Sequence, residues 1–273
     1  MITASLVLYK SKPSEVQRVL ECVENSSIDV VYVIDNSPTD ELKSIITGHF
    51  EKAKYFYGQG NVGFGDGNNI GIQKAIENNS NYHVVLNPDI IFQKRVIDGL
   101  KDYMDRNPDI GLIKPALTNF DGSFMASAMM LPTPFALFGK RLLPTTIADR
   151  INYYGEFRDL DLSVIRSVPI VSGSFMFIRV DLLKQIGGFD NRYFMYFEDF
   201  DLARRIHKKS KVVYYPLETI IHAHAAEHRT SRKLFWISIK SAIKYFNKWG
   251  WWFDSDRRKW NKEARSENSV LLK

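Results

Sequence analysis

The sequence has little of several features that would place a chain in a class at once. Cys22 is its only cysteine in 273 residues, which excludes an internal disulfide and favours a reducing compartment. No apolar run reaches the ~18–20 residues that a membrane-spanning helix needs. The N-terminus enters a strand-like run at once, with no basic region ahead of it, so we expect no signal peptide.

Two common nucleotide-binding patterns are missing as well. The sequence has no Gly-Lys-Ser or Gly-Lys-Thr, so its glycine-rich stretch at residues 58–71 is not a Walker loop. A dinucleotide-binding fold needs Gly-x-Gly-x-x-Gly directly after the first strand, whereas this stretch follows the third predicted strand. Its glycines stand between a strand and a helix, where backbone amides can approach a ligand closely. An ordinary surface turn is the alternative.

Positive charge is present but unevenly placed. The net charge is +6, yet residues 1–228 are slightly acidic, so the basic excess belongs to residues 229–273. A basic tail indicates an anionic partner surface, either a membrane or a nucleic acid. We expect no nucleic-acid partner, because the main body lacks a recognisable nucleic-acid-binding module.

Apolar strand-like runs alternate with helical patterns through most of the chain. This alternation predicts an α/β fold whose mainly parallel sheet carries helices on both faces. Residues 119–165 break the pattern, and so long an irregular segment is more often a binding loop or lid than filler. The predicted strands are residues 2–9, 30–34, 53–57, 82–86, 110–115, 170–178, 211–216 and 220–224. One predicted helix begins near Pro13, and two others span residues 40–50 and 95–106. Further helical patterns follow residues 71, 179 and 197.

Polar residues follow the predicted strands where an open α/β sheet binds its ligands. Asp35 ends the second strand, and Asp89 closes Asn87-Pro88-Asp89 after the fourth. A lone Asp with proline fixing the backbone before it can anchor a divalent metal and a diphosphate. Residues 172–174, Ser-Gly-Ser, allow close approach to a ligand. Ordinary turns remain the alternative for Asp35 and Asp89.

The densest chemistry lies in residues 193–205. An apolar run, residues 193–197, ends at Glu198 and Asp199, and a helical pattern follows. Apolar neighbours raise a carboxyl pKa, while a helix N-terminus favours its charged form, so this is a good place for a general base. Alternatively, the two carboxylates only complement the helix start, and Asp201 pairs with an arginine on the next turn.

Histidines and a tail helix follow. His222 and His224 have the spacing that places both on one strand face, and one of them joining Asp89 on a metal is more plausible than a histidine-only site. Residues 230–249 predict an amphipathic helix, followed by Trp251, Trp252 and Phe253. A basic amphipathic helix with tryptophans resembles an interfacial membrane helix, although its apolar face could also pack on the domain. We therefore predict a catalytic domain at residues 1–228 and a basic extension at 229–273.

Several motifs in order carry a resemblance to a known family. They are residues 34–37, 61–69, 86–89, 171–174, 187–190 and 194–201, with His222 after them. Together they resemble the rhamnosyltransferase branch of the family-2 glycosyltransferases over residues 1–230. The resemblance implies a GT-A fold and inverting transfer of a sugar from a nucleotide sugar.

The resemblance also implies roles for individual residues. Asp199 matches the general base, with Glu198 next in line, and Asp89 and His222 match the contacts to a divalent ion, Mg²⁺ or Mn²⁺, or to the diphosphate. The implied nucleotide-sugar site consists of Asp35, Asn61, Gly63, Asn69, Asn87, Ser172 and Gly173. Two departures stand out: one carboxylate replaces the family's frequent Asp-x-Asp, and residues 223–227 replace its glycine-rich stretch after the histidine.

The implied donor is dTDP-L-rhamnose, with UDP-galactofuranose or another UDP-hexose as the alternative. The implied acceptor is a lipid-diphosphate-linked saccharide in cell-surface polysaccharide synthesis. This predicts a cytoplasmic protein, peripheral at the inner face of the membrane, with a homodimer among the open oligomeric states. A non-catalytic nucleotide-sugar-binding protein is the alternative from another class.

Overall fold

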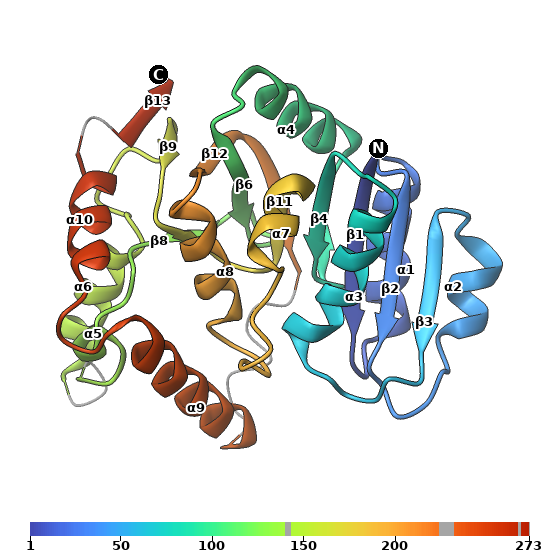
Figure 1. The fold of residues 1–273 in the computed structure, drawn as a ribbon, viewed down its shortest axis with the longest axis horizontal. Coiled ribbons are helices and arrows are strands. Elements are labelled where there is room, and N and C mark those ends of the chain that lie inside the picture. Colours follow the sequence, from blue (N-terminus) through green and yellow to red (C-terminus); the bar gives the residue numbers. More distant parts are fainter. Residues whose placement is uncertain (140–142, 224–231, 267–268, 273) are drawn as a thin grey trace.

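One long β-sheet separates two layers of helices (Figure 1). The structure is a computed structural model, and it describes residues 1–139, 143–223, 232–266 and 269–272. Within these residues the main sheet has the strand order β13-β9-β12-β6-β11-β4-β1-β2-β3, with β5 paired to β12 and β7 to β6. A separate small sheet pairs β8 with β10.

The strands are β1 (Ile2–Leu8), β2 (Val30–Asp35), β3 (Ala53–Tyr57), β4 (Tyr82–Leu86), β5 (Ile90–Ile91), β6 (Ile110–Thr118), β7 (Phe124–Met125), β8 (Ala128–Met129), β9 (Ile165–Ser167), β10 (Ile170–Val171), β11 (Phe175–Arg179), β12 (Lys211–His222) and β13 (Val270–Leu272). The helices are α1 (Pro13–Glu24), α2 (Lys43–His49), α3 (Phe64–Glu77), α4 (Lys94–Arg106), α5 (Pro134–Leu137), α6 (Thr145–Gly155), α7 (Val180–Ile186), α8 (Glu198–His207), α9 (Arg232–Trp249) and α10 (Ser255–Ala264).

The pairing of the strands confirms the predicted α/β class. β1 lies parallel between β2 and β4, and β2 lies parallel to β3. β6 and β12 form a second parallel pair, and β11 joins the two parts by pairing antiparallel with both β4 and β6. These strands are apolar on both faces because helices cover both sides of the sheet.

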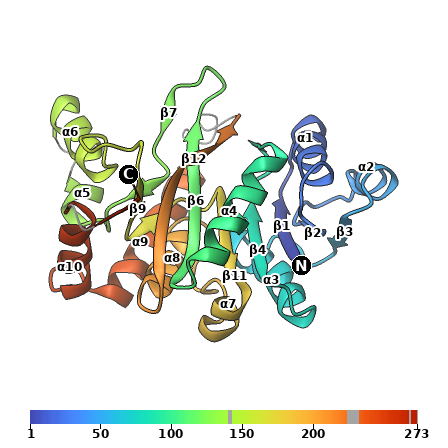
Figure 2. The same ribbon diagram turned by 90° about the horizontal axis from the view of Figure 1, so that it is seen from above.

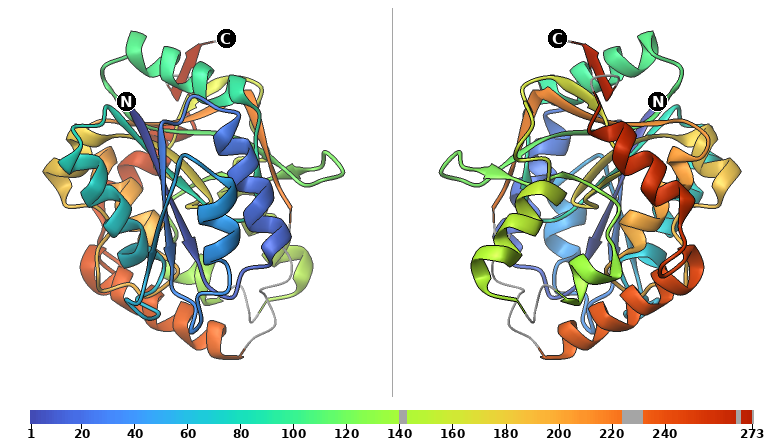
Figure 3. Two further views of the ribbon diagram at one scale, coloured as in Figure 1. Left: turned by 90° about the vertical axis from the view of Figure 1, so that its right-hand side faces the viewer. Right: turned by 90° about the vertical axis from the view of Figure 1, so that its left-hand side faces the viewer.

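Two apolar clusters hold the helices on the two faces of the sheet. Side chains of α1, α2 and α4 pack with one face, and side chains of α3, α7, α8 and α10 pack with the other. Seen from above, α1 and α2 lie opposite α3 and α7 (Figure 2). Parallel strands β1 and β2 point toward the end of the molecule where α9 lies, so their carboxyl ends open toward that helix (Figures 1 and 3).

Four local predictions were wrong. The predicted strand at residues 170–178 is two strands, β10 and β11, which belong to different sheets and are separated by the turn at residues 172–174. α3 begins at Phe64 and includes the second half of the glycine-rich stretch, because Gly67 and Gly71 let the helix pack directly on β1. The segment 119–165 contains α5 and α6 as well as β7 and β8. Residues 211–222 form one strand, with a register shift between Tyr215 and Thr219 where Pro216 interrupts the pairing.

The C-terminal helices pack on the side of the sheet that α8 covers. On α9, Ala242 and Phe246 are buried, whereas Trp236 is 61% exposed. Tyr245 and Phe246 join Tyr193 and Phe197 in a third apolar cluster, which connects α9 to the segment before α8. None of the described helices combines the length and the apolar character that crossing a bilayer requires.

Candidate active site

The carboxylates Glu198 and Asp199 open α8 beneath a strained turn. Tyr196 and Phe197 both have positive φ, 70° and 69°, which non-glycine residues rarely adopt. Backbone strain of this kind costs about 1–3 kcal/mol per residue and is found mainly at functional sites. Packing holds the turn here, because the Phe197 ring contacts both Phe200 and Tyr245. The strained turn therefore fixes where the two carboxylates begin the helix.

Backbone amides fix the Asp199 carboxylate. Gly173 N–H donates to Oδ2 at 2.8 Å, and Phe200 N–H donates to Oδ1 at 2.9 Å. A Cβ on Gly173 would lie 3.0 Å from Asp199 Cβ, so this approach requires glycine. Burial raises the pKa of Asp199, whereas the amide hydrogen bonds and the charge of Lys114 oppose the rise. The donors favour the carboxylate form of Asp199.

The environment of Glu198 favours the protonated form of its carboxyl. Its side chain is buried, and its Oε2 has no hydrogen-bond partner among the described residues. Burial first, and then the negative charge of Asp199, raise the pKa of Glu198 well above its usual range. When two adjacent carboxyls differ in this way, one stays neutral and the other remains available as a base. The order of Asp199 before Glu198 as the base stays a prediction.

Asp89 and His222 lie in contact where the start of β5 meets the end of β12. His222 Nε2 is 2.9 Å from Asp89 Oδ2, and Ala223 N–H donates to Asp89 O at 2.8 Å. The other ring nitrogen, Nδ1, and the nearby Asn87 Oδ1 are buried without a partner among the described residues. In that part of the chain, no group of three His, Cys, Asp or Glu side chains is placed to hold a metal ion. The structure thus supplies two of the predicted ligands, and His224 lies outside the described residues.

The turn at residues 172–174 connects the two parts of the site. Asn87 N–H donates to Ser174 O at 3.0 Å, and Ser174 directly follows the glycine that binds Asp199. Ser172 N–H donates to Ser127 O, which fixes the start of the same turn. The predicted base and the Asn87-Pro88-Asp89 motif are therefore held against one short backbone segment.

The glycine-rich loop reaches the same region from the other side. Gly63 has φ 91°, and a Cβ there would lie 2.2 Å from Phe194 O. The neighbouring Phe64 N–H donates to that same oxygen at 3.0 Å, and Gly65 lies against Glu198. Asn61, by contrast, is exposed, and its Oδ1 accepts a hydrogen bond from Gly63 N–H at 3.3 Å.

Two of the predicted nucleotide contacts already have protein partners. Asn69 binds both backbone groups of Phe189: its Nδ2 donates to the carbonyl at 2.9 Å, and its Oδ1 accepts from the amide at 2.7 Å. Asp35 is 1% exposed and accepts from Ser37 N–H and from the Tyr55 hydroxyl. Burial and the Asp35 hydrogen bond raise the pKa of Tyr55, so this hydroxyl stays a donor.

Lys114 is a charged residue at the site that the sequence interpretation missed. It is fully buried on β6, and its Nζ donates to Ser174 Oγ at 2.8 Å. The available signal was a lysine inside an otherwise apolar strand, since residues 110–117 contain no other charged side chain.

Helix α8 is also tied to the C-terminal helices through buried charges. Arg204 Nη2 lies 2.5 Å from Asp254 Oδ1, and both side chains are almost fully buried. The guanidinium of Arg204 also lies 4.3 Å from the centre of the Trp249 ring. The buried Asp201 pairs with Arg205 at 2.7 Å, as one alternative proposed, and also with Lys248 at 2.6 Å. The helix that carries the two carboxylates therefore packs between the sheet and the C-terminal segment.

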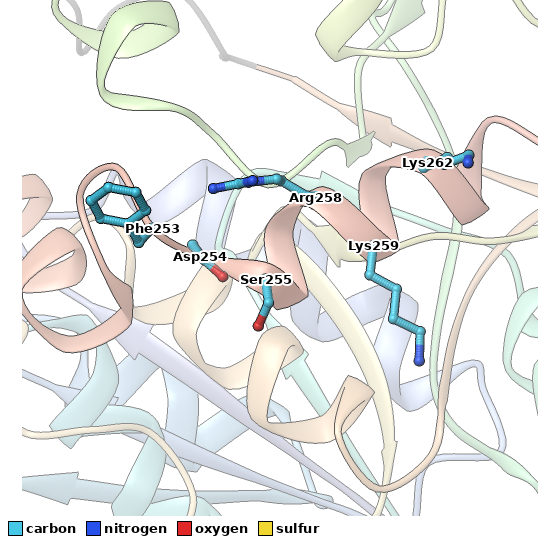
Figure 4. Close-up of a pocket in the computed structure, with 6 residues that line it drawn as sticks. All are labelled: Phe253, Asp254, Ser255, Arg258, Lys259 and Lys262. Carbon is cyan, nitrogen blue, oxygen red and sulfur yellow. The ribbon is translucent and has the colours of Figure 1, made fainter.

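Two hollows lie beside these elements. One, of about 550 Å³, is lined mostly by apolar residues of the segment 129–156, with Phe200 and Asn261. Phe200, the residue after Asp199, forms part of its wall. The other, also about 550 Å³, lies at the start of α10 between Phe253 and the basic side chains of Arg258, Lys259 and Lys262 (Figure 4).

Comparison with known proteins agrees with this geometry. Residues 6–187 match the sequence family described as Glycosyl transferase family 2. The chain belongs to this family. The prediction of a family-2 hexosyltransferase that is similar to rhamnosyltransferases is thereby confirmed.

Two curated relatives of this family-2 glycosyltransferase are rhamnosyltransferases by name. The N-acetylglucosaminyl-diphospho-decaprenol L-rhamnosyltransferase of Mycobacterium tuberculosis is 28% identical over 81% of this chain and 76% of the relative. Rhamnosyltransferase WbbL of Escherichia coli is 27% identical over 79% of this chain and 81% of the relative.

The crystal structure of GalNAc-T7 with UDP, GalNAc and Mn²⁺ superposes with a TM-score of 0.69 at 14% identity. The match covers 99% of this chain and 52% of that one. This similarity supports the GT-A fold, which confirms the predicted architecture.

Proposed function

We propose that the protein transfers L-rhamnose from dTDP-L-rhamnose, with inversion, to a hydroxyl of a lipid-diphosphate-linked saccharide, and that Asp199 is the general base. The observation that carries this proposal is the Asp199 carboxylate, fixed by Gly173 N–H in the turn that also binds the amide of Asn87. An inverting displacement needs a base on one side of the anomeric carbon and a group that holds the leaving diphosphate on the other.

The reaction then balances with the residues of this chain. Asp199 Oδ accepts the proton of the acceptor hydroxyl while that oxygen forms its bond to the anomeric carbon. The bond from this carbon to the diphosphate oxygen breaks, and the nucleoside diphosphate leaves with both electrons. Glu198 stays neutral, so it adds no second negative charge beside the forming bond. Strain at Tyr196 and Phe197 keeps the base in one position.

Asp89 and His222 are the proposed holders of a divalent ion, Mg²⁺ or Mn²⁺. One carboxylate, an imidazole and the buried amide oxygen of Asn87 fit such an ion, because Mg²⁺ in phosphate-transferring sites takes one or two carboxylates and completes its shell with phosphate and water. When bound, the ion supplies positive charge that stabilises the leaving diphosphate.

The nucleotide sugar is proposed to lie along the carboxyl ends of β1, β2 and β4. Asp35 is placed to contact the base or ribose through lone pairs that Ser37 and Tyr55 leave free. Asn61 and the backbone of Gly63 lie at the loop before α3, and Asn87, Ser172 and Gly173 lie beneath the sugar and diphosphate. Asn69 contributes by holding the Phe189 backbone in place.

The donor is proposed from the names of the two bacterial relatives, with UDP-galactofuranose or another UDP-hexose as the alternative. The lipid-linked acceptor follows the name of the mycobacterial relative. The apolar hollow beside Phe200 favours an acceptor that approaches from the side of α6.

A donor screen with Asp199→Asn tests both the activity and the base. The protein is incubated with dTDP-L-rhamnose, UDP-galactofuranose or UDP-hexoses and a polyprenyl-diphosphate saccharide, and released nucleoside diphosphate is measured. We expect turnover with dTDP-L-rhamnose and a loss of ~10²–10⁴-fold in kcat for Asp199→Asn. The matched control is Asp181→Asn, an exposed aspartate in the first turn of α7, which should keep wild-type kcat. Near-normal turnover of Asp199→Asn with both substrates saturating would remove Asp199 as the base. Donor binding without transfer in the wild type would instead favour a non-catalytic binding protein.

The C-terminal segment is proposed to hold the protein at the inner face of an anionic membrane. Trp252 is 69% and Phe253 88% exposed, and Phe253 lines the hollow of Figure 4 together with Arg258, Lys259 and Lys262. Each basic residue near an anionic bilayer contributes about 1 kcal/mol, and exposed aromatic rings suit the headgroup region.

Because Asp254 and Trp249 brace α8, point variants test this proposal better than deletion of the tail. Trp252→Ser with Phe253→Ser should weaken binding to vesicles that contain anionic lipid, measured by sedimentation. Phe120→Ser, at a 58% exposed ring in the turn after β6, is the control. Equal binding of the double variant and the control would exclude Trp252 and Phe253 as the anchor.

A further inference from the structure

The side chain of Lys114 has a place in the site that the reaction described above does not use. It is fully buried, and its Nζ–Ser174 Oγ hydrogen bond, at 2.8 Å, ends on a neutral acceptor. Leu112 and Ala116, two residues away on either side, pack in the cluster that includes Leu202 of α8. Alternate residues of a strand share a face, so Lys114 also lies on the face of the sheet that α8 covers.

A buried ammonium with a single neutral partner is unfavourable unless a negative charge lies close to it. The charge that compensates it is Asp199: burial lowers the pKa of Lys114 to about 7, and the Asp199 carboxylate opposes this change. Conversely, the charge of Lys114 lowers the pKa of Asp199. The two groups are also hydrogen-bonded to adjacent residues of one turn, since Ser174 binds Lys114 and Gly173 binds Asp199.

We propose that Lys114 is a positioning residue, the internal counter-cation that keeps Asp199 a carboxylate and, through Ser174, fixes the turn that holds it. The inference rests on the proposed role of Asp199 as the base. Replacing a buried charged group by an apolar one of similar shape is often neutral or stabilising, so stability alone gives little reason for a lysine here.

The other groups around Lys114 do not replace this interaction. Glu198 lies against Gly65 of α3, and burial raises the pKa of its carboxyl well above the usual range. On β12, Tyr214 pairs with Lys114, and burial raises the pKa of this tyrosine to about 12, so it stays neutral. One strand further, Arg166 binds Asp161 O and Ser269 Oγ. On β11 the flanking side chains, among them Met176, are apolar.

Lys114→Met, of similar length and uncharged, tests the proposal with two readouts. The first is the titration of Asp199 followed by NMR of protein labelled with ¹³C at the aspartate carboxyl carbon, with its signal assigned by its loss in Asp199→Asn. An opposite charge close to a carboxylate lowers its pKa by about 1–3 units, so we expect Lys114→Met to raise the titration midpoint of Asp199 by at least ~1 unit. The second is the acid limb of kcat/KM against pH, which should move upward by the same amount, with the KM for the donor unchanged.

Two further variants make the result decisive. Lys101→Met removes a 43% exposed lysine that pairs with Asp105 at the surface, and it should move neither readout. Ser174→Ala keeps the lysine but removes the hydroxyl that accepts its hydrogen bond, which disfavours the ammonium and should move both readouts in the same direction by less. If Lys114→Met does not fold, Ser174→Ala carries the test alone.

The outcomes separate this inference from the proposed function. An unchanged Asp199 titration in folded Lys114→Met, or in Ser174→Ala if the first variant does not fold, would overturn the inference even if the wild type transfers sugar. The Asp199 titration could instead differ between the wild type and the variants as expected while none of these proteins transfers sugar. That result would support the pairing of Lys114 with Asp199 and reject the proposed function.

Discussion

The two halves of the molecule are stabilised in different ways. In residues 1–109, buried polar side chains are mostly neutral and hydrogen-bonded, and helix α3 approaches β1 through glycine. In the described residues after 109, buried side chains with a formal charge are concentrated. They are Lys114, Arg166, Glu198, Asp201, Arg204, Asp254 and Arg257. The first half is organised to bring backbone close to a ligand, and the second to hold charge at the proposed proton-transfer site.

The pair Arg204–Asp254 gives the largest test of this difference. Asp254→Ala leaves an arginine buried without its carboxylate and also removes the side-chain cap of α10. Removing one partner of a buried ion pair costs about 3–5 kcal/mol. We expect urea denaturation to show a loss of this size in the free energy of unfolding.

Asp256→Ala is the matched control at the same helix start. Asp256 pairs with Lys208 at 3.3 Å, with both side chains more than a third exposed, and surface pairs contribute about 0–1 kcal/mol. If the two variants lose equal stability, the C-terminal half is not held by its buried charges.

His83 provides the corresponding test for the N-terminal half. It is fully buried, with Nδ1 2.9 Å from Thr3 Oγ1 and Nε2 3.0 Å from Ser5 Oγ. Ser5 donates its own proton to Asn68 Oδ1, so Nε2–H donates to Ser5, and in the neutral ring Nδ1 accepts from the Thr3 hydroxyl. Burial lowers the pKa of His83 to about 3, from 6.5 in the unfolded chain. A histidine pKa that is lowered on folding stabilises the protein above the unfolded value, and this stabilisation is lost as the pH falls below it.

We therefore expect the wild type to lose about 1.4 kcal/mol of unfolding free energy per pH unit through this group as the pH falls from 6.5 toward 3. His83→Gln should remove that slope, whatever its stability at pH 7. Urea denaturation over a pH series measures the difference. His49→Gln, at an exposed histidine, should keep the wild-type slope. Parallel curves for wild type and His83→Gln would show that His83 is not held neutral.

Gly71→Ala tests the close packing of α3 on β1. The new Cβ would lie 2.6 Å from Ser5 Cβ, and contacts that close force the backbone apart at a cost of about 1–3 kcal/mol. Gly48→Ala is the control, because a Cβ there meets no atom within 4 Å and Ala is favoured over Gly in a helix such as α2. We expect opposite signs from the two changes in thermal unfolding, and a stabilising Gly71→Ala would contradict the packing role.

The sequence predicted the features that depend on neighbours along the chain. The apolar runs that became β1, β2 and β4, and the polar residues Asp35 and Asp89 that end two of them, were found by local pattern. The different roles of the glycines could not be predicted in this way. Gly67 allows α3 to pack against Val7, whereas Gly63 allows a close approach to the backbone of Phe194, and only the structure shows these neighbours.

Long-range side-chain partners were also beyond the sequence. Asn69 was expected to lie near the nucleotide, but its partner is the backbone of Phe189, 120 residues away. Lys114 looked like one more residue of a strand, and its partner Ser174 lies 60 residues further on. The predicted roles of the site residues and the boundary at residue 228 stay predictions.

Glu198→Gln sharpens the comparison from the C-terminal side, because its pH dependence has the opposite sign to that of His83. Burial and the Asp199 charge raise the pKa of Glu198 above 4.5, its value in the unfolded chain. A carboxyl pKa that is raised on folding stabilises the protein at low pH, and this stabilisation is lost as the pH rises through the folded value. Glutamine has the same shape without the charge, so Glu198→Gln should match the wild type near pH 4 and gain about 1.4 kcal/mol relative to it for the first pH unit above 4.5.

Urea denaturation between pH 4 and pH 8 measures this gain, with Glu51→Gln at an exposed position as the control. Asp199 remains in both proteins, and its own titration responds to the loss of the Glu198 charge, so the difference between them reports the titration of the pair. A wild type and a Glu198→Gln variant that stay parallel over this range would mean that Glu198 is not the neutral member of the pair. The amide donors to Asp199 and the charge of Lys114 would then be too weak to separate the two carboxyls, and the role of base would have to be shared between them.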